Sequence, residues 1–190
     1  MSTKYKATVT NRAYFITITT VNWVDLFTRQ GLRKIITDSL SYCQKNKGLE
    51  IYAYCLMSSH LHLMCSSQND EKKLYEIIRD FKKFTSKKIV EYIQGNTESR
   101  KEWLLEMFKE AREHLAREQQ HKVWQDGYHA EMLMSNKFIY QKLNYIHMNP
   151  VKDGIVENPW DYIFSSARNY ADLEAPVEVV VLPPQLITVR

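Results

Sequence analysis

Two histidines at the start of an apolar, strand-like segment constrain this chain more than any other feature. His60 and His62 stand two residues apart in the stretch Tyr54 to Met64. Side chains at i and i+2 of a strand share one face, so we expect the two imidazoles side by side. Two neutral imidazoles supply part of a divalent-metal site and leave positions free for other ligands. The alternative is a pair of half-buried histidines that bond to the backbone.

A phenol and an amide form the second feature, on a helix expected from Asn136 to Asn149. Tyr145 and Asn149 are four residues apart, which places them on one helical face. Pro150 disfavours the α conformation at Asn149, so we expect the helix to end there. Other residues of this helix supply apolar packing, so Tyr145 need not fill the core, although packing is the commoner role of a helical tyrosine.

The ordered set of motifs resembles a known family. His60-Leu61-His62, followed much later by Tyr145 and Asn149, is similar to the HUH single-tyrosine endonucleases, particularly the REP-associated tyrosine transposases related to insertion-sequence transposases. Three longer blocks agree in order and rough spacing: Trp124 to Tyr128, Tyr145 to Val156, and Trp160 to Ser166. The resemblance covers about residues 10 to 170.

The resemblance implies a role for each site residue. His60, His62 and Asn149 would bind a divalent metal, and Tyr145 would be the nucleophile. Two imidazole nitrogens and an amide oxygen suit Mn²⁺ and are tolerable for Mg²⁺. The implied function is that of a DNA transposase, a metal-dependent single-stranded DNA endonuclease and strand transferase. It would act on hairpin or palindromic repeats through a 5′-phosphotyrosine intermediate.

Two other functions stay open. One is a DNA hairpin-binding protein that has kept the fold but does not cleave. The other is a metal-dependent hydrolase that uses water, with Tyr145 in the core. The chain also departs from the family pattern: Ser58-Ser59 stands where members commonly carry Pro-Asn, and Asp153 replaces a usual alanine.

Basic residues are concentrated on one expected helix. The chain has 26 Lys and Arg against 22 Asp and Glu, and its net charge of +4 is by itself a poor argument for nucleic acid. From Glu71 to Ile93, however, apolar residues follow helical spacing while lysines gather elsewhere on the surface. A solvated helix surface is the alternative to DNA contact. With the resemblance, the DNA-contacting residues we expect are Arg79, Lys82, Lys83, Lys87, Lys88 and Lys152.

The order of the expected elements predicts an α+β fold. Strands are expected over 14–20, 49–56, 60–66 and 129–134, and helices over 30–47, 71–93, 98–120 and 136–149. This succession fits a ferredoxin-like antiparallel sheet backed by helices, which is also the HUH core. We expect one domain over 1–171, with a helical insertion at 95–122, and a C-terminal tail over 172–190 that is either an added edge strand or a linker.

The cysteines and the lack of long apolar segments predict where the protein is located. Three cysteines without paired spacing indicate no disulfide framework, and neither a signal peptide nor a membrane span is evident. A cytoplasmic protein without membrane contact is therefore expected.

The expected 98–120 helix carries an apolar stripe that we expect to dock on the domain. The stripe runs from Trp103 through Leu104, Met107, Phe108 and Ala111 to Leu115. A homodimer contact is the alternative.

Overall fold

The computed structural model describes residues 7, 12–68, 72–112 and 121–184 of the chain. The described elements are, in chain order, β1 (Tyr14–Thr19), the short 3₁₀ helix η2 (Val21–Trp23), α1 (Gln30–Lys47), β2 (Leu49–Leu56), β3 (His60–Ser67), α2 (Leu74–Gly95), α3 (Lys101–Glu110), β4 (His129–Met132), α4 (Asn136–Lys152) and the 3₁₀ helices η3 (Pro159–Asp161) and η4 (Asn169–Ala171). None of the described helices is long and apolar enough to cross a membrane.

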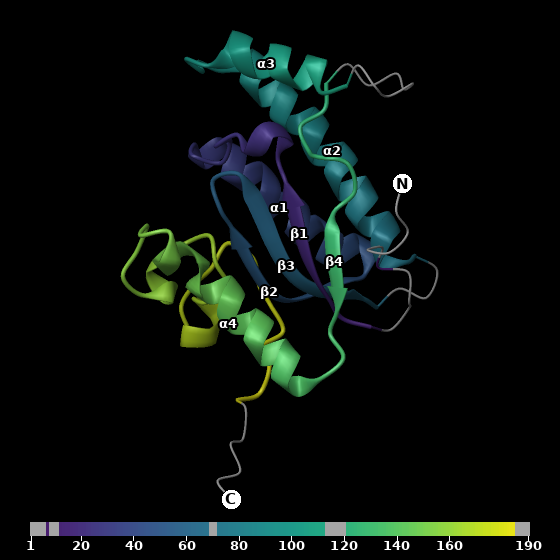
Figure 1. Cartoon of the computed structure of the whole chain (residues 1–190), viewed down its shortest axis with the longest axis vertical. Coiled ribbons are helices and arrows are strands. Elements are labelled where there is room, and N and C mark those ends of the chain that lie inside the picture. Colours follow the sequence, from purple (N-terminus) through teal and green to yellow (C-terminus); the bar gives the residue numbers. More distant parts are fainter. Residues whose placement is uncertain (1–6, 8–11, 69–71, 113–120, 185–190) are drawn as a thin grey trace, which may run out of the picture.

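The described strands form one antiparallel sheet in the order β2-β3-β1-β4 (Figure 1). β1 and β3 lie next to each other in the middle, and their register pairs Thr17 with His62 and Thr19 with His60. This strand order is that of the ferredoxin-like α+β arrangement, so the predicted fold class is confirmed.

The two faces of the sheet carry different helices. Ile16, Ile18 and Leu63 pack with buried residues of α1 and α2 on one face. On the other face, Phe15 and Met64 pack with Leu143 and Ile146 of α4. In Figure 1, α4 accordingly lies on one side of the sheet while α1 and α2 lie on the other. Strands covered on both faces become nearly all apolar, which makes His62 conspicuous in β3.

A bulge in β2 places its side chains on these two faces. The pairing with β3 shifts between Ile51, which is opposite Cys65, and Ala53, which is opposite Met64. Tyr52 is the extra residue, so Ile51 packs with the α1 and α2 side while Ala53 packs with the α4 side. One additional residue thus reverses the alternation within a single strand.

Helix boundaries agree with the sequence for α1 only. α2 spans Leu74–Gly95 in place of the expected 71–93, and α3 spans Lys101–Glu110 in place of 98–120, of which 113–120 lies outside the described residues. α1 begins at Gln30 and ends at Lys47 as predicted, because Gly48 adopts φ 71° and closes the helix with a bond from its N–H to Cys43 O. The expected end of α4 at Asn149 is wrong: the helix continues through Pro150 to Lys152. The Asp153 N–H bonds to Asn149 O, so Pro150 lies within the last turn of α4.

Helix α3 docks on the domain through Leu104, Met107 and Phe108, all buried. The predicted docking stripe therefore holds for these residues, whereas Trp103 is exposed. Leu115, which the same stripe included, lies outside the described residues. Phe84 of α2 falls within the apolar spacing of the expected 71–93 helix, but it is exposed and has the Lys88 ammonium over its ring.

The chain after η4 returns along the open edge of β2. Val177 is buried in the α1 and α2 core, and the Val180 N–H bonds to Ile51 O at 2.9 Å. Farther along, the Tyr140 hydroxyl of α4 donates to the Pro183 carbonyl. No strand is assigned to this described segment, yet it ties β2 to α4.

Lys82 of α2 holds the connection that leads into β4. Its ammonium donates to the carbonyl of Gln125 at 2.8 Å and to that of Gly127. Burial lowers the pKa of Lys82 from its ordinary value near 10.5 to about 8, against the opposing effect of the Asp126 carboxylate. This lysine is therefore engaged in tertiary structure.

The Lys82 shift makes a prediction for stability. Between about pH 8 and 10.5 the folded state loses the proton while the unfolded state keeps it, so stability rises with pH there. Lys82→Met removes this contribution. We expect the difference in unfolding free energy between wild type and variant to change by on the order of 2–3 kcal/mol across that range, measured by urea unfolding. Exposed Lys83→Met is the control, and equal pH slopes for Lys82→Met and wild type would contradict the prediction.

Candidate active site

His60 and His62 project from β3 toward α4, as the alternation predicted. Their ring centroids lie 4.6 Å apart. Both belong to the face that carries Phe15 and Thr17 of β1, because His62 stacks on Phe15 and bonds to Thr17. His62 is only 3% exposed. The pair therefore lies on the face of the sheet that α4 covers, next to β1.

Helix α4 presents Tyr145 and Asn149 to these histidines. Leu143 and Ile146 bury the helix against the sheet, and this orientation turns Tyr145 and Asn149 toward β3. The Tyr145 ring centroid lies 5.2 Å from that of His62, and Asn149 Nδ2 lies 3.4 Å from His62 Nε2. The four residues singled out in the sequence thus meet at one place.

The Asn149 amide, in the orientation that the structure gives it, selects one tautomer of His62. Asn149 Nδ2 can only donate, so His62 Nε2 has to accept from it. The proton is then on Nδ1, which donates to Thr17 Oγ1 at 2.9 Å. In this tautomer the Nε2 lone pair faces α4, which is the arrangement a metal-binding imidazole requires.

His60 is held in a similar way from the preceding turn. Its Nδ1 lies 3.1 Å from the Ser59 hydroxyl, and the Trp23 ring meets the imidazole edge to face with centroids 5.7 Å apart. Ser59 is one of the two serines at the position where the family commonly carries Pro-Asn. Here it contacts the first histidine directly.

Both imidazoles are neutral at ordinary pH. Burial lowers the pKa of His62 to about 3, and the nearby His60 and the Lys142 ammonium add to the effect. Burial also lowers the pKa of His60, while the Asp153 carboxylate opposes that shift. A neutral imidazole is the form that binds metals.

Positive charge surrounds the phenol. Lys142 Nζ lies 4.3 Å from the centroid of the Phe15 ring and 6.0 Å from that of Tyr145, and a 2.6 Å ion pair with Glu131 holds it there. Lys152 Nζ lies 5.7 Å from the Tyr145 ring centroid. Tyr145 itself is 38% exposed. An anionic group that approaches the phenol from solvent therefore meets two ammonium groups.

The donor set fits a divalent cation. Among the described residues, no three or more His, Cys, Asp or Glu side chains cluster as a metal site, so a third protein ligand has to be of another type. Asn149 is buried beside His62, and turning its amide over exchanges Nδ2 for Oδ1, which is a metal-binding oxygen. Two imidazoles and one amide are the set suited to Mn²⁺ or Mg²⁺.

The structure does not bring the basic helix to this site. α2 covers the opposite face of the sheet from α4. Among its cations, Arg79 pairs with Asp80, Lys87 and Lys88 pair with Glu91, Lys82 binds the two carbonyls described above, and Lys83 is exposed on this same helix. Of the six residues predicted to contact DNA, Lys152 is the one placed next to Tyr145.

Two other described histidines, His147 and His129, have partners of their own. His147 turns away from Tyr145, as expected from its spacing, and its Nε2 lies 2.9 Å from Ser166 Oγ. Burial lowers its pKa to about 4. His129 is opposite Thr17 in the pairing of β1 with β4, on the face of the sheet that carries His62, and it pairs with Glu131 at 3.2 Å. His114 lies outside the described residues.

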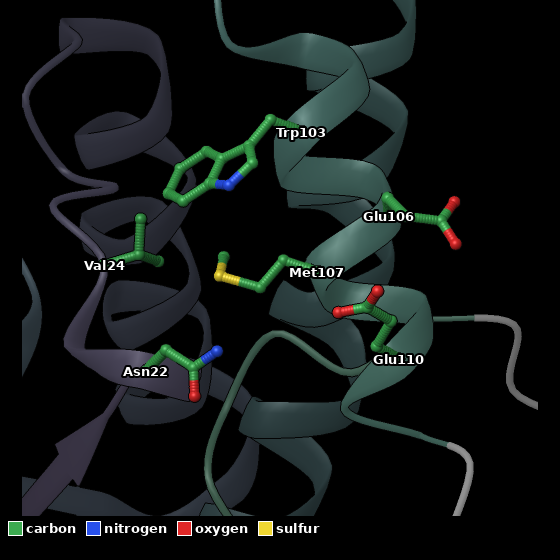
Figure 2. A pocket seen from close by; sticks show the side chains of 6 residues that line it. All are labelled: Asn22, Val24, Trp103, Glu106, Met107 and Glu110. Carbon is green, nitrogen blue, oxygen red and sulfur yellow. The ribbon is translucent and has the colours of Figure 1, made fainter.

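A hollow of about 330 Å³ lies between the segment after β1 and helix α3, and none of the four candidate site residues lines it (Figure 2). Asn22 and Val24 line one wall, and α3 supplies Trp103, Glu106, Met107 and Glu110 on the other. Figure 2 shows both glutamates on the α3 side of the opening. Two carboxylates repel phosphate, so the hollow does not extend the candidate site.

Sequence reasoning missed four residues that shape the site: Thr17, Ser59, Trp23 and Lys142. Thr17 reaches His62 through the pairing of β1 with β3, a register that the sequence does not specify. Ser59 was noted only as a departure from the family pattern. Lys142 is three residues before Tyr145, a helical spacing that could have signalled it.

The hydrogen bonds of His62 predict its protonation. We expect the imidazole to remain neutral, with its proton on Nδ1, down to about pH 4, because its pKa is lowered to about 3. Long-range ¹⁵N NMR correlations of the imidazole, recorded as pH is lowered, measure both properties. Titration of His62 near pH 6, or a proton on Nε2, would contradict this geometry.

A family model and two solved structures that are similar to this chain are described as transposases. The family model described as "Transposase IS200 like" matches residues 8–149. One solved structure, described as a REP-associated tyrosine transposase bound to a REP hairpin, shares 20% identity, with a TM-score of 0.62 over 99% of this chain and 100% of that chain. A putative transposase from Deinococcus radiodurans R1 shares 17% identity, with a TM-score of 0.41 over 76% of this chain and 95% of that chain.

No curated protein matches the chain. At 20% identity the first structural likeness shows a shared fold, in agreement with the strand order described above. The family match has greater weight, since it includes β1, both histidines, Tyr145 and Asn149. Because it spans most of the sequence, the chain belongs to the IS200-like transposase family.

Proposed function

We propose that this transposase is a metal-dependent single-stranded DNA endonuclease and strand transferase that acts through a 5′-phosphotyrosine intermediate. The observation that supports the proposal is the position of Tyr145, half-exposed and 5.2 Å from the buried ring of His62. A tyrosine used only for packing would not need two neutral imidazoles and a buried amide beside it.

The proposed substrate is DNA that carries a hairpin. The solved structure with the same fold is described as bound to a REP hairpin. In the present chain, Lys142 and Lys152 supply the positive charge that a DNA backbone requires, on the face that carries Tyr145. A single strand beside the hairpin would bring its phosphate to the phenol.

The chemical step uses residues of α4 and β3. Tyr145 Oη forms a bond to phosphorus while the bond from phosphorus to the 3′ oxygen breaks. The phenol loses its proton to solvent, and the 3′ oxygen gains one to become a free hydroxyl. Reversal with a different 3′ hydroxyl joins a new strand, so the covalent bond conserves the energy for strand transfer.

His60, His62 and Asn149 are the residues proposed to hold the metal. A bound divalent ion polarises the phosphoryl oxygens and fixes the direction of attack. The residues themselves contribute rigidity: Thr17 and Ser59 fix the two imidazole rings, and burial keeps both rings neutral. Lys142, held by Glu131, keeps a cation beside the phenol.

Replacement of the nucleophile tests the proposal. We expect Tyr145→Phe to reduce cleavage of end-labelled single-stranded hairpin DNA by about a thousandfold or more, since the attacking oxygen is lost. Denaturing gels of reactions with Mn²⁺, Mg²⁺ or chelator resolve the covalent protein–DNA species. Tyr42→Phe, at an exposed tyrosine of α1, is the control and should cleave normally.

Each other outcome identifies a different function. Metal-dependent cleavage that persists in Tyr145→Phe, without a covalent species, would indicate hydrolysis by water. Hairpin binding without cleavage by the wild-type protein would indicate a DNA-binding protein that has kept only the fold.

The hydroxyl behind His62 supplies a second prediction. Thr17→Val keeps the shape of the side chain but removes the partner of Nδ1, and loss of such a partner weakens metal affinity by about 10- to 100-fold. Binding of Mn²⁺, followed by the EPR signal of the free ion, measures this. Thr19→Val is the matched control, because Thr19 is on β1 like Thr17 but is paired with His60 of β3. Equal Mn²⁺ affinity for wild type and Thr17→Val would contradict the role of Thr17.

A further inference from the structure

The indole of Trp23 is an exposed aromatic surface beside the candidate active site. Trp23 ends η2, directly after β1, and is 60% exposed. Its ring meets that of His60 with an interplanar angle of 68°. The edge-to-face contact places the indole next to the metal-binding pair and leaves most of its surface in solvent.

The backbone that carries this ring is strained. Asn22 has φ 51° and Trp23 has φ 53°, so two consecutive residues other than glycine adopt the left-handed conformation. For a bulky side chain this conformation is an outlier, and such outliers persist only where the surrounding structure fixes them.

Hydrogen bonds on both sides fix the turn. The Thr20 hydroxyl lies within bonding distance of the carbonyls of Val24 and Ser59, at 3.0 and 2.9 Å. The Val21 N–H bonds to the Val123 carbonyl at 2.9 Å. The strained turn is thus tied to the residue that precedes His60, and the Trp23 ring is held at a constant position relative to the histidines.

Packing does not explain this position. Trp124, by contrast, is buried, stacks on Phe27 and donates its indole N–H to Thr85. Strain that presents an exposed indole is instead typical of a binding surface.

We propose that Trp23 is a nucleobase-binding residue that stacks on an unpaired base of the strand whose phosphate lies at the active site. This proposal rests on the proposed function and adds a binding site to it. Aromatic side chains bind single strands by stacking, which tolerates any base because every base has a π face.

The surroundings of the turn favour the His60 side for the DNA strand. Asn22, the residue before Trp23, faces the hollow lined by Glu106 and Glu110 (Figure 2). The carboxylates on that side repel phosphates. Lys152 and Lys142 of α4 lie near Tyr145 and do not line that hollow. A strand that passes the histidines therefore has cations along its backbone and one indole for a base.

The test measures DNA binding without cleavage. All variants carry Tyr145→Phe, and the probe is a fluorescein-labelled DNA hairpin with single-stranded oligothymidine on both sides. Fluorescence anisotropy should show that Trp23→Ala raises Kd by about 5- to 100-fold, while Trp23→Phe keeps most of the affinity. Trp103→Ala is the matched control, since Trp103 is 56% exposed on α3 and lines the acidic hollow.

Salt and a blunt hairpin separate stacking from charge. The loss in Trp23→Ala should be the same fold at every salt concentration, because stacking releases no counterions. It should also vanish for the same hairpin without single-stranded extensions. Thermal unfolding of Trp23→Ala and Trp23→Phe establishes that both are folded.

Two results would overturn the proposal in distinguishable ways. Equal Kd values for folded Trp23→Ala and its parent would remove the stacking role and leave the proposed function intact, since the wild type would still cleave. If the wild type neither binds nor cleaves the extended hairpin, the proposed function fails and the role of Trp23 fails with it.

Discussion

The register between β1 and β3 is the constraint on which the site depends. It pairs Thr17 with His62 and thereby supplies the hydroxyl that orients the second imidazole. Side chains alternate along a strand, so a slip of one residue would turn His62 into the apolar face. Ile16 and Leu63 are completely buried on that face, and exchanging them for an imidazole would be costly. The stability of the core and the position of the histidines therefore have the same origin.

Helix α4 combines packing and chemistry on adjacent turns. Leu143 and Ile146 anchor it on the sheet, and Tyr145 and Asn149 use the orientation that results. The same face of the sheet binds the helix and carries the histidines. The buried side chains of Leu143 and Ile146 are therefore close to the half-exposed phenol of Tyr145. Lys142 bridges that region: its ammonium lies over Phe15 and pairs with Glu131.

Much of this arrangement was predictable, and the exceptions have physical reasons. Periodicity and a terminal glycine predicted α1 to the residue, and alternation with helical spacing predicted which faces His60, His62, Tyr145 and Asn149 would share. The end of α4 was wrong because the preference of the residue before proline is weak, and burial of Asn149 and Pro150 outweighs it. Trp103 and Phe84 were assigned to apolar stripes, yet each lies at the margin of its helix's buried face, which composition cannot resolve.

The contacts that complete the site could not be predicted in the same way. Thr17 acts across a strand pair, and its partner depends on a register that one sequence does not specify. The left-handed backbone at Trp23 could not be predicted from residue type, since neither Asn22 nor Trp23 is glycine. The position of the α2 lysines relative to Tyr145 could not be predicted either. Their helical spacing is visible in the sequence, but it is the packing of α2 on the opposite face of the sheet that separates them from Tyr145.

The late segment that ties β2 to α4 has a consequence for biosynthesis. Its contacts join Ile51 to Val180 and Tyr140 to Pro183, so the helix that carries the tyrosine is clamped by residues made last among those described. A ribosome that has just produced Tyr145 has already made both histidines but has not yet made Val180 and Pro183. The nascent chain therefore lacks these two contacts with β2 and α4 until Val180 and Pro183 have been made and have left the exit tunnel.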